Sequence, residues 1–197
     1  MLFRSNYFGQ CDVPALPAGL TYVQIAAGCG TGEAHSLARR SDGSVVAFGN
    51  NSYGQCNVPA LPVGVTYVDI EAGSNFSLAR RSDGVVVAWG GSLYGQISVP
   101  VTASPLVKFS AGGLHAAAIR ASGTVACWGA NYFSQLNVYP GPAGVSYVGV
   151  AAGSQHTLAL RTDGVVRAWG NNYSNQLAIP GLPAGRRYTE VFAGGNT

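Results

Sequence analysis

The sequence is poor in charge, in thiols and in long apolar stretches. Charged residues make up 10% of its 197 residues, and the formal net charge is only +3. So small a charge does not give the dense basic patch that nucleic acid requires, and we expect no nucleic-acid partner. No apolar run approaches the ~18 residues of a membrane span, so we expect no membrane partner either. The 4 cysteines show no CxxC spacing, which argues against a zinc or redox motif.

The signatures of catalysis and of secretion are missing as well. The 8 carboxylates include no close pair of the glycosidase kind, and neither a phosphate-cradling loop nor a nucleophile elbow occurs. We therefore predict a protein that is not an enzyme and uses no cofactor. The segment from Met1 to Tyr7 lacks the basic start and apolar core of a signal peptide, so a full-length chain of this kind is expected in the cytoplasm.

What the sequence has in abundance is glycine and internal repetition. An aromatic residue followed by glycine recurs with a period of about 40 residues. The four aromatic residues are Phe48, Trp89, Trp128 and Trp169. The period divides the chain into units of residues 1–49, 50–90, 91–129 and 130–170, with a partial unit at 171–197. We interpret positions that all units share as structural, because every unit needs them.

Each unit predicts four short strands, which we letter A to D. In the first unit, strand A runs from Tyr22 to Ala27, strand B from His35 to Arg40, strand C from Ser44 to Phe48 and strand D from Gln55 to Val58. An Asp-Gly turn joins strands B and C, since both residues of such a turn tolerate positive φ. Pro59 ends strand D because proline cannot donate to a ladder. Four strands at a period of ~40 predict an all-β fold, a β-propeller of four-stranded antiparallel blades.

The repeat also resembles a known family. The segment from His156 to Gly170 closely resembles the repeats of the regulator of chromosome condensation family. The segment from Tyr53 to Pro59 looks like that of bacterial members, among them the propeller-type protein inhibitor of β-lactamases. The resemblance implies a ring of seven blades. This chain holds four complete units plus partial terminal strands, so we expect an open arc or an incomplete ring. An incomplete ring would be part of a longer protein. In either case the exposed blade edges favour self-association.

One face of the blades is predicted to carry the binding site. The A–B and C–D loops lie on the same face and vary between units, whereas the turns and linkers of the other face barely change. Variable loops on a rigid scaffold are where recognition tends to sit, and tyrosine is a favoured anchor. The expected contact residues are Tyr7, Cys29, Thr31, Glu33, Asn75, Leu93, Leu114, Tyr132, Gln155 and Tyr173. The alternative is that these tyrosines only pack on the neighbouring loop.

Three histidines invite a chemical interpretation. His35, His115 and His156 share one position in three units, and Phe76 takes it in the fourth. Histidines around an axis could bind a metal. Because these lie on separate blades and a phenylalanine replaces one of them, we interpret them as packed side chains and predict no metal site.

An arginine precedes each Asp-Gly turn or its equivalent. The four copies are Arg40, Arg81, Arg120 and Arg161, and three of them have an aspartate two residues later. The pattern indicates local charge pairs, and the aspartates largely cancel the alternative, a basic ring for phosphates.

Together these patterns favour a non-enzymatic protein–protein interaction module, which binds an unidentified protein partner through the A–B and C–D loop face. The resemblance leaves three alternatives: an enzyme inhibitor similar to the β-lactamase inhibitor, a guanine-nucleotide exchange factor for a small GTPase, or a structural segment of a larger repeat protein. The bacterial-looking linkers and the lack of a matching insertion weigh against the exchange factor.

Overall fold

The computed structural model describes residues 6–28, 34–101 and 105–195 of the chain. This part forms twelve β-strands in four antiparallel sheets of three strands, and it has no helix long and apolar enough to cross a membrane. The all-β propeller class predicted from the sequence is confirmed. We number the sheets as blades. Blade 1 contains β1 (Tyr22–Ala27), β2 (His35–Arg40) and β3 (Val45–Gly49), and blade 2 contains β4 (Tyr67–Ala72), β5 (Phe76–Arg81) and β6 (Val86–Gly90). Blade 3 contains β7 (Leu106–Ala111), β8 (His115–Arg120) and β9 (Val125–Gly129), and blade 4 contains β10 (Tyr147–Ala152), β11 (His156–Arg161) and β12 (Val166–Gly170).

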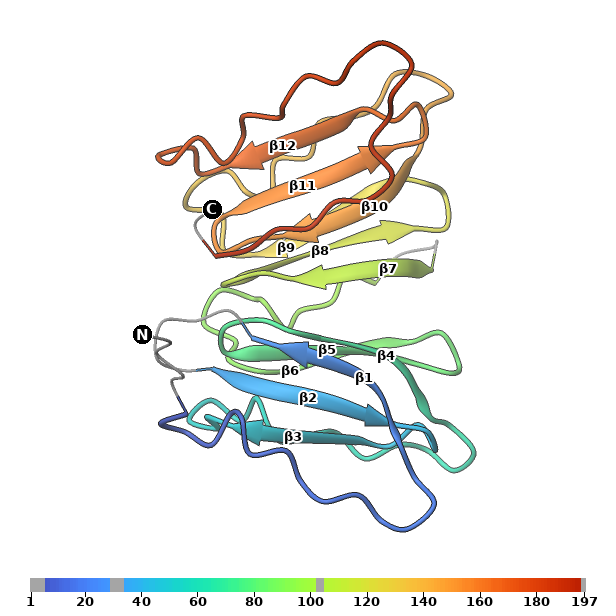
Figure 1. Ribbon diagram of the computed structural model, residues 1–197, viewed down its shortest axis with the longest axis vertical. Coiled ribbons are helices and arrows are strands. Elements are labelled where there is room, and N and C mark those ends of the chain that lie inside the picture. The colour runs from blue at the N-terminus through green and yellow to red at the C-terminus, as the bar shows by residue number, and fades with distance from the viewer. Residues whose placement is uncertain (1–5, 29–33, 102–104, 196–197) are drawn as a thin grey trace.

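The four blades follow one another in chain order along the long axis of the molecule (Figure 1). Each blade is a meander in which the middle strand pairs with both of its neighbours. The first strand of a blade contacts the blade before it, so β4 lies against β1 and β2, and β10 lies against β7 and β8. The described residues therefore form an open row, with blades 1 and 4 at opposite ends.

Only three of the four predicted strands form in each blade, which corrects the prediction for strand D. The segment from Gln55 to Val58 is not a strand, because side-chain contacts take up its backbone groups. The N–H of Cys56 donates to Asn51 Oδ1 at 2.8 Å, and the carbonyl of Gln55 accepts the indole N–H of Trp89 at 2.9 Å. Side chains thus satisfy the groups that a ladder would otherwise bind.

The turn between the second and third strands also differs from the expectation. Of its two central residues only the glycine has a positive φ, for example 80° at Gly43 and 85° at Gly84. The aspartate before the glycine instead accepts a hydrogen bond from the backbone ahead of it. In blade 1 the N–H of Ser44 donates to Asp42 Oδ1 at 2.9 Å. The carboxylate therefore stabilises the turn through the local contact that aspartate makes in an Asx-turn.

The hydrophobic core lies between blades rather than within one sheet. Leu37 of blade 1 packs in one cluster with Tyr67, Ile70 and Trp89 of blade 2. The other two interfaces repeat the arrangement with Leu78, Phe109 and Trp128, and with Ile119, Val125, Tyr147 and Trp169. Each sheet is therefore held by its neighbours, which explains why the third strands are apolar without a polar alternation.

Each tryptophan ties its blade to the loop of the preceding blade. The indole N–H groups donate at 2.8–2.9 Å to the backbone carbonyls of three buried glutamines. The pairs are Trp89 with Gln55, Trp128 with Gln96, and Trp169 with Gln135. The repeated glutamine therefore marks the point where one blade attaches to the next.

The buried histidines make a second contact between blades. His35 Nε2 lies 2.8 Å from Ser77 Oγ, and His115 Nε2 lies 2.9 Å from Thr157 Oγ1. The hydroxyl of Ser77 gives its own proton to the carbonyl of Gln55 at 2.8 Å. The histidine is therefore the donor, and the neutral imidazole carries its proton on Nε2.

At the interface of blades 2 and 3, this histidine–hydroxyl pair is replaced as a unit. Phe76 takes the histidine position and Ala116 takes the hydroxyl position, and both are fully buried in the same core cluster. A phenylalanine cannot donate a hydrogen bond, and an alanine leaves room for its larger ring. The chain itself thus shows that either pair is compatible with the interface.

We expect the interface to tolerate replacement of the histidine and the hydroxyl residue together, but not of either one alone. His115→Phe should lower the free energy of unfolding by about 1–3 kcal/mol, because the ring meets the bulkier Thr157. Adding Thr157→Ala copies Phe76 and Ala116 and should recover on the order of 1 kcal/mol. Urea unfolding of the two single variants and the double variant measures this coupling, and strictly additive losses would contradict it.

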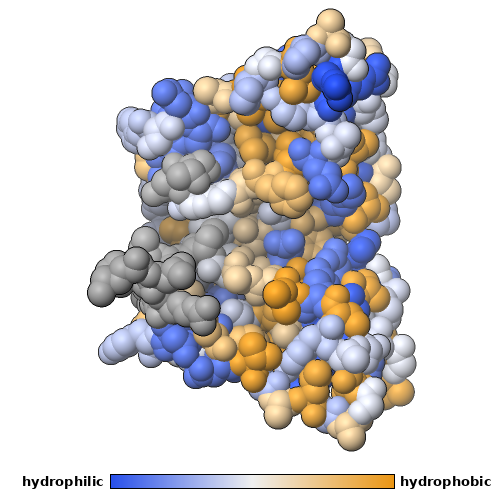
Figure 2. Space-filling view, in the orientation of Figure 1, coloured by the Kyte–Doolittle hydropathy of each residue, from blue (hydrophilic) through white to orange (hydrophobic). Residues whose placement is uncertain are grey.

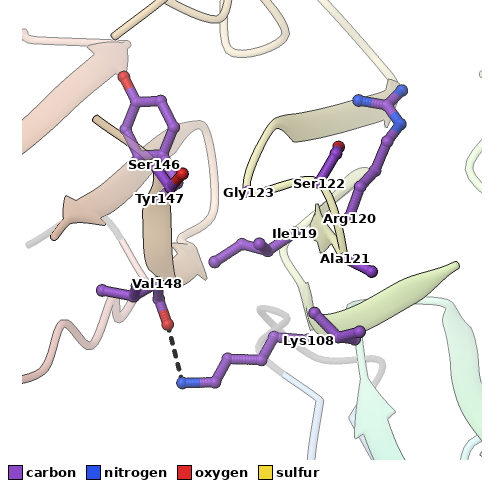
Figure 3. A pocket seen from close by; sticks show the side chains of 10 residues that line it. Lys108, Ile119, Arg120, Ala121, Ser122, Gly123, Ser146, Tyr147 and Val148 are labelled. Atoms are coloured by element: carbon purple, nitrogen blue, oxygen red, sulfur yellow. Dashed lines mark hydrogen bonds between the residues drawn. The ribbon is translucent and has the colours of Figure 1, made fainter. Parts of the chain in front are cut away.

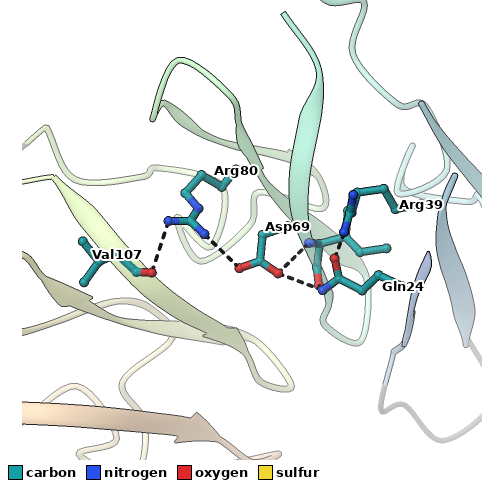
Figure 4. Close-up of polar contacts among 6 residues, drawn as sticks. Gln24, Arg39, Asp69, Arg80 and Val107 are labelled. Carbon is teal, nitrogen blue, oxygen red and sulfur yellow. Dashed lines mark hydrogen bonds and ion pairs between the residues drawn. The ribbon is translucent and has the colours of Figure 1, made fainter. Parts of the chain in front are cut away.

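The first strand of a blade has a free edge, and side chains of the preceding blade cover it. Gln24 Nε2 donates to Asp69 Oδ1 at 2.8 Å, and Asp69 is 3.7 Å from the guanidinium of Arg80. Arg80 Nη1 in turn donates to the carbonyl of Val107 in β7 at 3.3 Å (Figure 4). This polar chain runs from blade 1 to blade 3 and occupies edge groups that would otherwise be open to strand pairing.

The two ends of the row differ from its middle. Ile25 in β1 is 78% exposed, whereas Ile70, its equivalent in β4, is fully buried. The fifth copy of strand A, from Tyr188 to Ala193, is not a strand in the structure, because no second strand pairs with it in the described part of the chain. Figure 2 shows apolar side chains interspersed among polar ones over the face in view. Self-association through the blade edges stays a prediction.

Candidate interaction surface

Hydrogen bonds between side chains and backbone groups hold the C–D loops in place and so fix the positions of the residues at their tips. In the loop after blade 1, Asn51 accepts the N–H of Cys56, and Gln55 Oε1 accepts the N–H of Tyr53 at 2.9 Å. Equivalent asparagine contacts of 2.9–3.0 Å join Asn131 to Leu136 and Asn172 to Leu177. Because these hydrogen bonds already order the loop backbone, the backbone loses little entropy when a partner binds.

The tips of these loops carry an exposed row of aromatic side chains. Tyr94 meets Tyr132 edge to face, with ring centroids 5.4 Å apart, and Phe133 meets Tyr173 in the same way at 6.2 Å. Tyr132 is still 71% exposed and Tyr173 89% exposed. We call Tyr94, Tyr132, Phe133 and Tyr173 the aromatic row. Tyr132 and Tyr173 each pack on an aromatic ring of the neighbouring loop and still present most of their surface to solvent.

Two further predicted contact residues continue the line of loop tips. Leu93 is 81% exposed beside Tyr94, and Tyr7 is 86% exposed and packs edge-on against Phe8 at 4.8 Å. The structure therefore gives one exposed apolar or aromatic tip to each of four C–D loops. Hydrogen bonding with Tyr94 raises the pKa of the Tyr132 phenol above its ordinary value.

The amides of the A–B loops make hydrogen bonds to the C–D loops, and their contact with a partner stays a prediction. Asn75 Oδ1 accepts Gln96 Nε2 at 3.3 Å, and Gln155 Oε1 accepts Asn171 Nδ2 at 2.7 Å. Both side chains therefore hold an A–B loop against a C–D loop, and their carbonyl oxygens are already in use.

Of the remaining predicted contact residues, the structure describes Leu114 but not the three in the long first loop. Leu114 contributes its carbonyl, which accepts the N–H of Ala130 at 2.8 Å. Cys29, Thr31 and Glu33 lie outside the described residues.

The expected contact residues do not include Tyr94 and Phe133, which form half of the aromatic row. Tyr94 and Phe133 are half-buried, and each supports the exposed tyrosine of the next loop. Tyr53 at the same position is 50% exposed. The signal was present as an aromatic residue at the second tip position in Tyr94 and Phe133, but each contact joins different repeats, so one repeat alone does not show it.

The histidines are buried at the start of the second strand of their blades and are held neutral. Burial lowers the pKa of both His35 and His115 to about 4, and the nearby His156 contributes to the shift of His115. Their Nδ1 atoms are buried without a hydrogen-bond partner. Among the residues that the structure describes, no three histidines, cysteines or carboxylates come together as a metal site.

A cavity of about 290 Å³ opens on the side of the molecule that carries the first strands of the blades. Its lining includes Glu71, Phe109, Ser110 and Phe192. Burial and, to a lesser degree, the neighbouring charge of Asp69 raise the pKa of the Glu71 carboxyl to about 7. This carboxyl therefore titrates near neutral pH, and its effect on stability has the opposite sign to that of the histidines.

These features define a propeller of repeated blades whose variable loops form a continuous surface. The family model of the regulator of chromosome condensation (RCC1) repeat matches residues 22–55, 67–96, 106–135 and 147–176. The chain therefore belongs to the RCC1 repeat family. No curated protein matches the sequence significantly.

Several solved structures share the fold. Prp20p from Saccharomyces cerevisiae is 22% identical with a TM-score of 0.67, and the match covers 86% of this chain and 49% of Prp20p. The ectodomain of the Arabidopsis thaliana receptor kinase ACR4 is 24% identical with a TM-score of 0.68, covering 89% and 65%. Human WBSCR16 is 20% identical with a TM-score of 0.69, covering 96% and 63%. The chain thus spans about half to two thirds of the length of these proteins.

Proposed function

We propose that the protein is a non-catalytic interaction module that binds a protein partner through the loop face, with the aromatic row at its centre. The observation that carries the proposal is the exposure of Tyr132 and Tyr173 on loops that are already ordered. Tyrosine buries a large area at low entropic cost and is enriched among the residues that dominate binding energy. Two such anchors on adjacent blades suit a partner that spans both loops.

The similar structures support a protein as the partner. Prp20p is described by its binding to Gsp1p and histones, and Kap60 has been crystallised bound to yeast RCC1. Both observations concern other proteins, and the partner of this chain is a proposal from its own surface. A rigid face that displays tyrosines rather than charges favours a partner with an apolar, hydrogen-bonding contact surface.

Alanine substitution of the tyrosine anchors tests the proposal. In Tyr132→Ala and Tyr173→Ala, the affinity for the partner should fall at least about tenfold each, while the melting temperature stays close to that of the wild type. Proteins retained by the wild type and lost with both variants identify the partner, and titration calorimetry with the purified partner measures the loss.

The matched control is Phe192→Ala, which removes an equally exposed aromatic ring away from the C–D loops. It should leave the affinity unchanged. Equal binding by the tyrosine variants and the wild type would refute the loop face as the binding site.

A further inference from the structure

The face of blade 4 that points away from blade 3 repeats half of an interface between blades, and we call it the outer face. The segment from Tyr188 to Ala193 lies on this face as the first strand of a blade lies on the blade before it (Figure 1). The N–H of Ser154 donates to the carbonyl of Gly195 at 3.1 Å, and the N–H of Ser74 donates to the equivalent carbonyl of Gly113 at 3.2 Å. A first strand is therefore in place, whereas the described residues contain no second and third strand to follow it.

The outer face leaves apolar side chains partly uncovered that the interfaces inside the row bury. Leu37 is fully buried against blade 2, whereas Leu158, its equivalent in blade 4, is half-buried. Ile70 is fully buried in β4, whereas Val191, its equivalent in the segment, is half-buried. The missing second and third strands are the elements that cover these positions elsewhere in the row.

The buried histidine of blade 4 lacks the hydroxyl that its copies bind. At the two interfaces that hold a histidine, its Nε2 atom bonds a hydroxyl from the second strand of the next blade, as His35 bonds Ser77 at 2.8 Å. His156 is only 2% exposed, yet its Nε2 atom has no hydrogen-bond partner among the described residues. A buried polar atom of this kind favours a partner that supplies the missing hydroxyl.

The backbone carbonyl of Gln176 also lacks its partner. Its copies accept the indole N–H of the tryptophan in the third strand of the next blade, for example Gln55 from Trp89 at 2.9 Å. Gln55, Gln96 and Gln135 are at most 2% exposed, whereas Gln176 is half-buried. No hydrogen bond to the carbonyl of Gln176 occurs within the described part of the chain, so an indole N–H from another hairpin would find this acceptor free.

The segment on the outer face has a free backbone, unlike the first strands inside the row. The strand β10 pairs with β11, and its Val148 carbonyl also accepts a hydrogen bond from Lys108 Nζ of the preceding blade at 2.8 Å (Figure 3). Gly149 replaces the lysine in blade 4 and has no side chain that could bind the segment. Among the described residues, no backbone group from Tyr188 to Ala193 has a hydrogen bond. Free groups along an extended segment are a template for a further strand.

In blade 2 a single hairpin supplies both of the missing partners, with Ser77 on β5 and Trp89 on β6. We propose that the outer face binds a β-hairpin of a partner protein, with a serine or threonine on its first strand and a tryptophan on its second. The hairpin pairs with the segment from Tyr188 to Ala193, its hydroxyl binds His156, and its indole N–H binds the carbonyl of Gln176. Addition of strands to a free edge is a common mode of recognition.

A partner protein suits this site better than a second copy of the chain. Each hairpin of the four described blades is already paired with its own first strand, so a second copy would have to unfold a blade to supply one. The site is separate from the proposed tyrosine anchors, and either proposal can fail without the other.

The probe is a fluorescent cyclic peptide with the sequence of the blade 2 hairpin, residues 75–91. The ends lie side by side in the structure, where the N–H of Gly91 donates to the carbonyl of Asn75 at 2.8 Å, so they can be joined. An isolated hairpin is only marginally stable in water, and closing the ring lowers the entropy cost of binding. Saturable binding with a Kd below about 100 μM is expected in a fluorescence anisotropy titration. No saturable binding up to about 1 mM peptide would overturn the proposal.

Substitutions in the peptide test each contact without altering the protein. Ser77→Ala and Trp89→Ala should each weaken binding at least about tenfold. Val85→Ala, at the exposed turn of the hairpin, is the matched control and should leave the affinity unchanged. Equal affinity of either contact variant and the parent peptide would also overturn the proposal.

A variant of the protein should reverse the preference between two of these peptides. His156→Phe copies Phe76, which faces Ala116 instead of a hydroxyl in blade 3. The variant should bind the Ser77→Ala peptide more tightly than the parent peptide, whereas the wild type prefers the parent. The same order of preference in both proteins would refute the contact with His156. If the variant does not fold, the peptide substitutions still decide the outcome.

Two controls separate this site from the alternatives. Tyr132→Ala should bind the peptide normally, because it acts only on the loop face. Light scattering of the protein alone tests for a second copy as the occupant: dimers that the peptide does not dissociate would show that a second copy fills the site, contrary to the proposal.

Discussion

Acidification is expected to destabilise the protein between pH 6.5 and pH 4 through its buried histidines. In the folded state burial holds the pKa of His35 and His115 at about 4, whereas an unfolded histidine titrates at the ordinary pKa of 6.5. Between these values the unfolded chain takes up protons that the folded state refuses, so the free energy of unfolding falls as the pH falls. A shift of this size corresponds to about 3 kcal/mol for each histidine. Burial lowers the pKa of His156 as well, which adds to the effect.

Glu71 acts in the opposite direction over part of the same range. Its folded pKa is about 7 against an ordinary value of 4.5, so the folded state holds a proton that the unfolded chain has released. Lowering the pH from 7 to 4.5 therefore stabilises the protein through this one group. Two or more histidines outweigh one carboxyl, and the net result is a loss of stability on acidification.

Urea unfolding at a series of pH values measures the net effect, and two variants separate its parts. Glu71→Gln removes the opposing contribution, so the loss on acidification should become steeper. His115→Phe combined with Thr157→Ala removes one histidine without leaving a buried hydroxyl, so the loss should become shallower. If neither variant changed the pH dependence, the buried groups would not be its source.

The repeat explains which parts of the fold could be predicted. Strand boundaries such as Tyr67–Ala72 and Tyr147–Ala152 follow from sequence periodicity, since every blade repeats them. The prediction of strand D was wrong. The strand propensity of these residues and the proline at their end do not reveal the asparagine and tryptophan side chains that bind the backbone of this segment. Those contacts join different parts of the chain, and Trp89 is far in sequence from Gln55.

The candidate interaction surface, too, could be predicted from the sequence only in part. The variation among loop tips predicted Tyr132 and Tyr173, and the structure places them on adjacent blades with most of their surface exposed. The edge-to-face contacts of the aromatic row depend on the rotation between blades, which the sequence of one repeat does not contain.

Truncation of a core tryptophan is expected to cause the largest loss of any single substitution. Trp169 is 2% exposed and packs between blades 3 and 4 against Ile119, Val125 and Tyr147. Trp169→Ala removes this volume and leaves a cavity, so the free energy of unfolding should fall by about 3–5 kcal/mol. A loss of that size is a large fraction of the stability of a typical domain. Chemical denaturation compared with the wild type measures it.

Trp169→Phe is the matched control, because Phe48 occupies the same position in blade 1. It keeps most of the apolar volume and removes the indole N–H that donates to the carbonyl of Gln135. That carbonyl still accepts the hydroxyl of Thr157 at 2.9 Å, so it does not become an unsatisfied buried acceptor. The loss should therefore be only about 1 kcal/mol, the net value of one hydrogen bond. Equal losses for the two variants would mean that the hydrogen bond, and not the packed ring, holds blade 4 to blade 3.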